Sequence, residues 1–275
     1  MSTVTELLKA ILYGIVEGVT EWLPVSSTGH LILLGESLPL AISPAFSEAF
    51  DVVIQLGAIL AVVLLYFHKL NPLSPRKSPL ERKQTRRLWL RVCIAVLPSA
   101  VAGVLLDDWL DAHLYNGITV AITLTVYGML FIWLESGKST HPRITSSEDV
   151  DPRHALLIGM FQMLSLIPGT SRSGATILGA RLVGTSRAAA AEFSFFMAIP
   201  TMLGAALVKS AKLLTSGTEI TATEWLILSV GCLSAFLVSL CTIRFLMDFV
   251  SRHSFAPFGW YRIALGALVL VCSLR

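Results

Sequence analysis

Six long apolar stretches constrain the fold of this chain more than any other feature of its sequence. A helix that crosses a membrane needs about 20 mostly apolar residues, and each stretch reaches or nearly reaches that length. Only 14% of the 275 residues are charged, whereas soluble domains carry about 25%. The composition therefore excludes a soluble enzyme, a nucleic-acid binder and a disordered chain, and it predicts an all-α integral membrane protein. The six predicted transmembrane helices lie at approximately 50–67, 88–106, 117–135, 188–210, 223–243 and 256–274.

Two further apolar stretches are interrupted in the middle by residues that break helices. The first, roughly 4–36, is interrupted at LPVSSTGH (23–30), and the second, roughly 154–184, at IPGTSRSG (167–174). Proline and glycine flanked by hydroxyl residues break a helix. Non-helical backbone at membrane depth is tolerated only where it is buried in protein or lines a watery cavity. We therefore predict two re-entrant helix–loop–helix hairpins rather than two more spans.

The charges of the connecting segments predict the orientation, because cytoplasmic loops carry an excess of Lys and Arg. The segment after the first span is strongly basic, which places it in the cytoplasm. The next loop is acidic (Asp107, Asp108 and Asp111), which suits the outside. Six crossings then place both termini outside, so that the first hairpin enters from the outside and the second from the cytoplasm. The basic residues of the first loop are Lys69, Arg76, Lys77, Arg82, Lys83, Arg86, Arg87 and Arg91.

The two hairpins resemble each other when the chain is shifted by 145 residues. Together with the opposite sides of entry, this similarity indicates an inverted repeat within a single membrane domain of residues 1–275. The halves lie at approximately 1–135 and 154–275, and a cytoplasmic linker, 136–153, joins them. Such repeats place a site near the midplane, where the broken helices meet. The aligned pairs are Gly14–Gly159, Glu17–Gln162, Ser26–Ser171, Thr28–Ser173 and Gly29–Gly174.

Two glutamates precede the first break. Ionisable groups in a bilayer cost about 2.5–3.5 kcal/mol each, so they must pair, bind a cation or face water. Glu17 and Glu21 are four residues apart, which puts their Cβ atoms roughly 6 Å apart on one helical face. Two carboxylates at that separation repel unless a cation or a shared proton lies between them. Mg²⁺ or Ca²⁺ would bind such oxygens and bridge to phosphate. The alternative is a solvated polar stripe at the mouth of the hairpin.

The string SSTGH (26–30) supplies hydroxyls and an imidazole near the start of a helix. A helix N-terminus presents free N–H groups and a positive dipole end, so we expect Ser26 and Thr28 to bind phosphate. His30 comes three residues after Ser27. That is close enough to deprotonate Ser27, protonate a leaving group or accept a phosphoryl group. The alternative is a polar N-terminal cap with a packed histidine.

The second hairpin carries SRSG (171–174) in the matching position. Arginine is always charged, and its fork of donors fits phosphate oxygens bidentately. In the repeat alignment Arg172 falls opposite Ser27. If the hairpin tips meet, they present a guanidinium and a hydroxyl to the same ligand. The alternative is a structural arginine that binds carbonyl groups of the broken helix. The expected phosphate-binding residues of this hairpin are Ser171, Arg172, Ser173 and Gly174.

The cysteines and tryptophans have no predicted chemical role. The four cysteines stand singly in apolar runs, so we expect small buried hydrophobes rather than a metal site or disulfides. The six tryptophans lie near segment ends, as interfacial anchors do. They are Trp22, Trp89, Trp109, Trp133, Trp225 and Trp260.

Two motifs resemble those of a known family. EGVTEWLPVSSTGH (17–30) and PGTSRSGAT (168–176) resemble the undecaprenyl-diphosphate phosphatase family of the bacitracin-resistance type. The resemblance covers nearly the whole chain, including its length, the basic loop after the first span and EFSFFMAIP (192–200). Two long motifs at the expected separation are highly specific.

The resemblance implies hydrolysis of undecaprenyl diphosphate to the monophosphate, which recycles the lipid carrier of peptidoglycan synthesis and confers bacitracin resistance. It also implies a divalent metal, a place in the bacterial inner membrane and an active site open to the periplasmic side. The expected partners are the polyprenyl diphosphate and membrane lipids, without nucleic acid, and a homo-oligomer stays open. The family's motifs correspond to Glu17 and Glu21, to Ser26, Ser27, Thr28 and His30, and to Ser171, Arg172 and Ser173.

Two questions stay open at the level of sequence. Ser27 is our choice as phosphoryl acceptor, with His30 as its base and Glu21 as a partner that orients the histidine. Attack by His30 or by metal-bound water is the alternative. The second function class is transport, as a polyprenyl-phosphate flippase or a small-anion transporter. The hydroxyl–histidine and carboxylate pairs favour an enzyme, because a transporter needs neither a nucleophile nor a bound metal. A structural membrane subunit would leave the buried ionisable groups without purpose.

Overall fold

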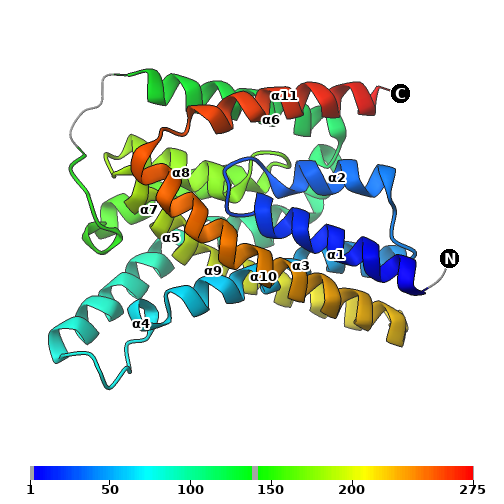
Figure 1. Ribbon diagram of the computed structural model, residues 1–275, viewed down its shortest axis with the longest axis horizontal. Helices are drawn as coiled ribbons and strands as arrows, with labels where there is room; N and C mark the ends of the chain where they lie inside the picture. Colours follow the sequence, from blue (N-terminus) through cyan, green and yellow to red (C-terminus); the bar gives the residue numbers. More distant parts are fainter. Residues whose placement is uncertain (1–2, 138–141, 275) are drawn as a thin grey trace.

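The computed structural model describes residues 3–137 and 142–274 as a bundle of helices, with both described ends on the same side (Figure 1). Two short 3₁₀ helices, η1 (Ser147–Asp149) and η2 (Leu164–Leu166), interrupt the connections. The α-helices are α1 (Thr3–Thr20), α2 (Ser27–Ser37), α3 (Pro44–Leu65), α4 (Phe67–Leu70), α5 (Pro79–Leu114), α6 (Gly117–Ser136), α7 (Pro152–Met163), α8 (Arg172–Leu182), α9 (Arg187–Thr215), α10 (Ala222–Arg252) and α11 (Ala256–Ser273).

Six of these helices are long and apolar enough to cross a membrane: α3, α5 as far as Leu106, α6, α9, α10 and α11. They coincide with the six apolar stretches of the sequence, so the predicted number and position of the spans are confirmed. Large apolar side chains stand exposed along them, as Val104 does at 77% and Leu207 at 63%. An apolar surface of this extent indicates burial in lipid. The chain is therefore a multi-pass membrane protein.

Two sequence-based expectations about these helices are wrong. The acidic segment expected as a loop is helical, because α5 continues to Leu114. The segment contains no glycine or proline, and aspartate alone lowers helix propensity too little to end a helix. Asp108 is exposed, whereas the side chains of Asp107 and Asp111 lie outside the described part. The four cysteines are free, as predicted, but none is fully buried, and Cys93 and Cys241 are exposed. Cysteine is apolar enough to face lipid.

The two interrupted stretches form the helix pairs α1–α2 and α7–α8, which extend toward each other from opposite sides of the bundle (Figure 1). Helix α1 packs along α10, and α7 packs along α5. Both contacts are so close that they require glycine. A Cβ atom on Gly14 would lie 2.4 Å from the carbonyl oxygen of Gly231, and one on Gly159 would lie 2.1 Å from that of Ala95. These two glycines form an aligned pair in the sequence.

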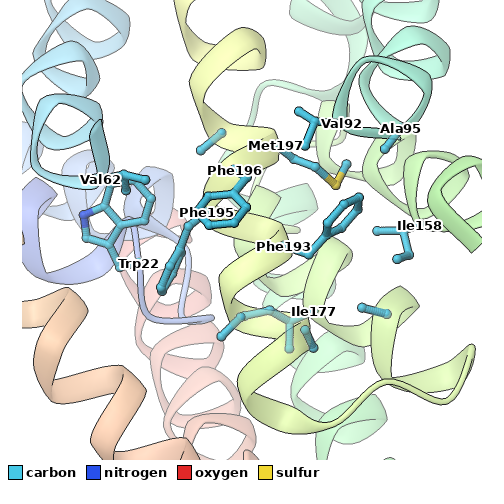
Figure 2. Close-up of a cluster of buried hydrophobic side chains, with 14 of the residues drawn as sticks. Trp22, Val62, Val92, Ala95, Ile158, Ile177, Phe193, Phe195, Phe196 and Met197 are labelled. Atoms are coloured by element: carbon cyan, nitrogen blue, oxygen red, sulfur yellow. The ribbon is translucent and has the colours of Figure 1, made fainter. Parts of the chain in front are cut away.

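A cluster of buried aromatic residues supports the loop of the first hairpin (Figure 2). Phe193, Phe195 and Phe196 of α9 are fully buried. Trp22, in the loop between α1 and α2, is also fully buried, and its ring centroid lies 5.3 Å from that of Phe195 in an edge-to-face contact. The prediction that Trp22 is an interfacial anchor is therefore wrong. Its ring instead fixes the loop against α9.

Candidate active site

The two breaks end in the same unusual backbone conformation. Ser26 and Ser171 have φ angles of 74° and 71°, and no other non-glycine residue in the described ranges has a positive φ. Each serine is the N-cap of the following helix. The Ser26 Oγ accepts a hydrogen bond from the Gly29 N–H at 3.4 Å, and the Ser171 Oγ accepts one from the Gly174 N–H at 3.1 Å. Such conformations cost about 1–3 kcal/mol each and occur mainly at functional sites.

The carboxylate of Glu21 joins the two helix pairs, α1–α2 and α7–α8. Its Oε2 accepts a hydrogen bond from the Ser27 hydroxyl at 2.8 Å, and its Oε1 accepts one from Arg172 Nη2, also at 2.8 Å. The side chains of the ion pair are 6% and 9% exposed for Glu21 and Arg172 respectively. The Ser173 hydroxyl also donates to the Glu21 backbone carbonyl at 3.0 Å. A hydroxyl and a guanidinium from distant parts of the chain therefore meet on one carboxylate.

Helix α9 and the first loop hold the guanidinium of Arg172 in place. Its Nη1 donates to the Ser194 carbonyl at 2.7 Å. The guanidinium carbon lies 5.8 Å from the centre of the Trp22 ring, within the range of a cation–π contact. The hydroxyl of Thr176, one turn along α8, is 2.6 Å from that of Ser194. The guanidinium is thus held between α9 and the Trp22 ring.

His30 makes contacts that differ from the sequence-based expectation. Its Nδ1 is 2.7 Å from the Ser26 carbonyl oxygen, which makes Nδ1–H the donor, and its Nε2 is 2.7 Å from the Tyr261 hydroxyl. The Ser27 hydroxyl donates to Glu21 instead of to the imidazole. The turn after α1 folds Glu21 over the start of α2, whereas α11 presents Tyr261 to the histidine. In this arrangement the group in contact with Ser27 is Glu21.

Glu17 lies one turn before Glu21 and is completely buried. Neither of its carboxylate oxygens has a hydrogen-bond partner among the described residues. A buried carboxylate without a partner is costly, and a bound cation would remove that cost. No group of three or more His, Cys, Asp or Glu side chains with metal-site geometry is found in the described ranges. Mg²⁺ is usually bound through one or two carboxylates together with substrate phosphates, and the two glutamates suit that mode.

The other predicted residues lie in the first turns of α2 and α8. Ser26, Ser171 and Gly174 contribute to the caps described above, and the Ser171 and Ser173 hydroxyls are 3.1 Å apart. Thr28 is half-buried at the start of α2, outside the chain of bonds through Glu21. The predicted residues therefore lie in the loops that join α1 to α2 and α7 to α8 or within about one turn of them.

Sequence reasoning missed two residues of α11 that reach these tips. Tyr261 bonds to His30, and Arg262, which is fully buried, donates to carbonyl groups in both loops. A signal for Arg262 was present, because it is an ionisable residue inside an apolar stretch, and such residues are functional candidates by default. Tyr261 gave no such signal, since tyrosine is common near helix ends in membranes.

This arrangement can hold and attack a phosphate ester. The Ser27 hydroxyl is hydrogen-bonded to a carboxylate, which is how a nucleophile is positioned beside a base. Arg172 supplies a charged donor fork in the same place, and donors aimed at developing negative charge lower the barrier to phosphoryl transfer. The first turn of α8 adds the positive end of a helix dipole.

Comparison with known proteins agrees with this chemistry. The family model described as bacitracin resistance protein BacA matches residues 10–268. A protein named undecaprenyl-diphosphatase from Limosilactobacillus fermentum is 56% identical over 266 residues, which are 96% of each chain. Proteins of the same name from Lactiplantibacillus plantarum and Enterococcus faecalis are 53% and 54% identical, over 96% of this chain and 97% and 96% of their own. The chain belongs to the bacitracin resistance protein BacA family.

Proposed function

We propose that the chain hydrolyses undecaprenyl diphosphate to undecaprenyl phosphate and inorganic phosphate. Relatives of that name match it over nearly its full length. The observation that carries the proposal is the chain of bonds from Ser27 through Glu21 to Arg172, which places a nucleophile, a base and an anion-binding group together. The reaction returns the lipid carrier to peptidoglycan synthesis, and resistance to bacitracin fits the family.

Ser27 is the proposed nucleophile. Its Oγ attacks the terminal phosphorus while its proton passes to Glu21 Oε2, the atom to which it is bonded at 2.8 Å. The bond from that phosphorus to the bridging oxygen breaks, and undecaprenyl phosphate leaves. Water then hydrolyses the phosphoserine, which releases inorganic phosphate and returns the proton to Ser27. His30 activates that water through Nε2, which exchanges its bond to the Tyr261 hydroxyl for one to the water, takes the water proton and releases it to solvent.

Arg172 is the proposed group that holds the terminal phosphoryl group. It is bonded to Glu21, and a diphosphate, which carries more negative charge, competes with the carboxylate for the same donors. Moving Arg172 from Glu21 to the substrate frees Glu21 Oε1, while Glu21 Oε2 keeps the Ser27 hydroxyl as its partner. The Ser173 side chain and the N–H groups at the start of α8 complete the phosphate site.

We also propose a divalent cation, Mg²⁺ or Ca²⁺, as a cofactor. Glu17 is the primary ligand because its buried carboxylate has no other partner among the described residues, and Glu21 is the second. When bound, the ion would neutralise part of the diphosphate charge. Ser27, Glu21 and Arg172 position and attack the phosphate as described above.

Chelation tests both the activity and the metal. Detergent-purified protein is expected to release phosphate from undecaprenyl diphosphate, and removal of divalent ions with EDTA should lower the rate by about 10²-fold or more. Added Mg²⁺ or Ca²⁺ should restore it, and Glu17→Gln should raise the metal concentration required. A transporter or flippase would release no phosphate in detergent, where no membrane separates two compartments. Full activity after exhaustive chelation would contradict the metal assignment alone.

We infer that the two helix pairs are re-entrant hairpins related by an inverted repeat. The matched φ angles of Ser26 and Ser171 support this relation, as do the matched close contacts of Gly14 and Gly159. Each helix pair also packs against helices of the other half in a matching way. Helix α1 packs on α10 as α7 packs on α5, and α2 touches α11 as α8 touches α6. The hairpin tips then form one site, reached by the diphosphate from the periplasmic side of the inner membrane.

Cysteine labelling tests the orientation. In a background without the four native cysteines, Leu80→Cys at the basic end of α5 should react with an impermeant thiol reagent only from the cytoplasmic side. Glu219→Cys, in the connection between α9 and α10, is the matched control and should react only from the outside. Both positions are exposed. Reaction of position 80 from the outside would invert the proposed topology and place the termini in the cytoplasm.

A further inference from the structure

Arg262 is a fully buried arginine in the middle of α11, outside the chain of bonds that links Ser27, Glu21 and Arg172. Its contacts are to backbone carbonyl groups. Nη1 donates to Pro24 O at 3.1 Å, and Nη2 donates to Gly169 O at 2.9 Å and Thr170 O at 2.8 Å. The Pro24 carbonyl belongs to the loop between α1 and α2, and the other two carbonyls belong to the loop between α7 and α8. A single guanidinium therefore binds both hairpin tips.

The contacts along α11 position Arg262 for this role. Helices α6 and α11 pack closely along their length (Figure 1). Gly128 and Gly259 face each other there, and a Cβ on either would lie 2.7 Å from the other's carbonyl oxygen. The arginine Nε lies 3.5 Å from the Leu124 carbonyl of α6. Its guanidinium carbon is 5.5 Å from the centre of the Tyr127 ring.

The charge of Arg262 is balanced by dipoles and a ring rather than by a carboxylate. No ion pair of the described residues includes it. Loop carbonyls at membrane depth have no water to bind and need donors from the protein. Arginine meets this need in two loops at once because its five N–H groups form a rigid planar fork, whereas the three N–H groups of lysine share one atom.

The carbonyls that Arg262 binds lie next to the reacting groups. Pro24 is midway in sequence between Glu21 and Ser27, so its position sets the turn that brings these two together. A Cβ on Gly174 would lie 3.1 Å from Arg262 Nη1, which places the guanidinium against the first turn of α8, two residues after Arg172. A shift of either loop would therefore separate Glu21 from Ser27 or from Arg172.

We propose that Arg262 is a positioning residue for the phosphatase reaction, which holds the two hairpin tips in register so that Ser27, Glu21 and Arg172 meet. This inference rests on the function proposed above. It assigns Arg262 no contact with the substrate. Its loss should therefore reduce the rate of the bound complex rather than the binding of substrate.

The test compares Arg262→Met, Arg262→Lys and Val269→Ala in detergent-purified protein, with polyprenyl diphosphate as substrate. Val269 is buried two turns further along α11, where its apolar side chain cannot bind a loop carbonyl, and it serves as the control for loosened packing against α6. Arg262→Met should lower kcat by about 30-fold or more while KM changes less than about threefold, since misplacing reacting groups by 1 Å costs about 10²-fold. Arg262→Lys should recover part of the loss. Val269→Ala should keep at least half of the activity, because loosened packing lowers Tm without separating the two loops.

A second measurement does not depend on activity. Hydrogen exchange in both loops, 21–26 and 167–171, should accelerate by about tenfold or more in Arg262→Met and stay unchanged in Val269→Ala. Should Arg262→Met fail to fold, Arg262→Lys is judged by the same two readouts, with a smaller expected loss of kcat of about threefold or more. The proposal is overturned if the folded variants keep the wild-type kcat and loop exchange, or if Val269→Ala loses as much kcat as Arg262→Met. Inactivity of the wild-type protein would instead contradict the proposed function, and loop exchange would still decide the role of Arg262.

Discussion

Replacement of Arg172 by alanine is expected to lower kcat for phosphate release by about 10³-fold or more, because an arginine that neutralises a transferring phosphoryl group contributes 10³–10⁵-fold. The variant also leaves Glu21 Oε1 without its charged donor. Arg172→Lys should recover little activity, because an ammonium group cannot reproduce the bidentate fork that reaches Glu21 and Ser194 together. The measurement is steady-state phosphate release in detergent, on protein whose gel-filtration profile matches the wild type.

Arg187→Ala is the matched control for this prediction. Arg187 is also an arginine paired with a glutamate, Glu135, but it is the first residue of α9, beyond the C-terminal end of α8, whereas Arg172 is the first residue of α8. Its loss removes an ion pair outside the Glu21–Arg172 site, and Glu135 keeps Arg181 as a partner at 3.7 Å, so activity should stay within about threefold of wild type. If Arg172→Ala kept a tenth or more of the wild-type kcat, the guanidinium would not be the group that neutralises the transferring phosphoryl group.

Replacement of Ser27 by alanine should reduce kcat by about 10³-fold or more, since the loss of a nucleophile leaves only the contribution of binding and electrostatics. The effect on stability should be small, about 1 kcal/mol, because one hydrogen bond to Glu21 is removed. KM should change little, as the groups that hold the diphosphate remain. Ser37→Ala is the control. Ser37 is the last residue of the same helix, is exposed, and its hydroxyl donates to the Leu33 carbonyl, so its replacement should leave kcat unchanged.

Much of the fold could be predicted because its signals are local. A run of about 20 apolar residues specifies a span whatever surrounds it, and proline and glycine among hydroxyl residues mark a break. Ser26 and Ser171 are matched when the chain is shifted by 145 residues, and this match agrees with the φ angle above +70° that both residues adopt. The helix ends were less predictable. Helix α5 continues to Leu114 because nothing in its acidic segment stops it.

The partners within the site could not be predicted, because they depend on how separate helices pack. The sequence puts Ser27 and His30 three residues apart and Glu21 six residues before Ser27, which favours the histidine as the partner. The turn after α1 instead brings Glu21 to the Ser27 hydroxyl, so that the carboxylate is its partner. The contact of His30 with Tyr261 spans 231 residues, and no local pattern indicates it. Trp22 likewise has an interfacial position in the sequence, yet packing against α9 buries it.

The central claim is that the two hairpin tips form one phosphatase site in which Ser27 accepts the phosphoryl group. Rapid-quench trapping with undecaprenyl diphosphate labelled in its terminal phosphate tests this claim most directly. The account predicts an acid-stable phosphoserine at position 27 that forms before phosphate is released and is absent from Ser27→Ala. An acid-labile adduct that persists in Ser27→Ala would assign the attack to His30. Release of phosphate with no trapped adduct at any time would assign it to water, and either result would contradict the account.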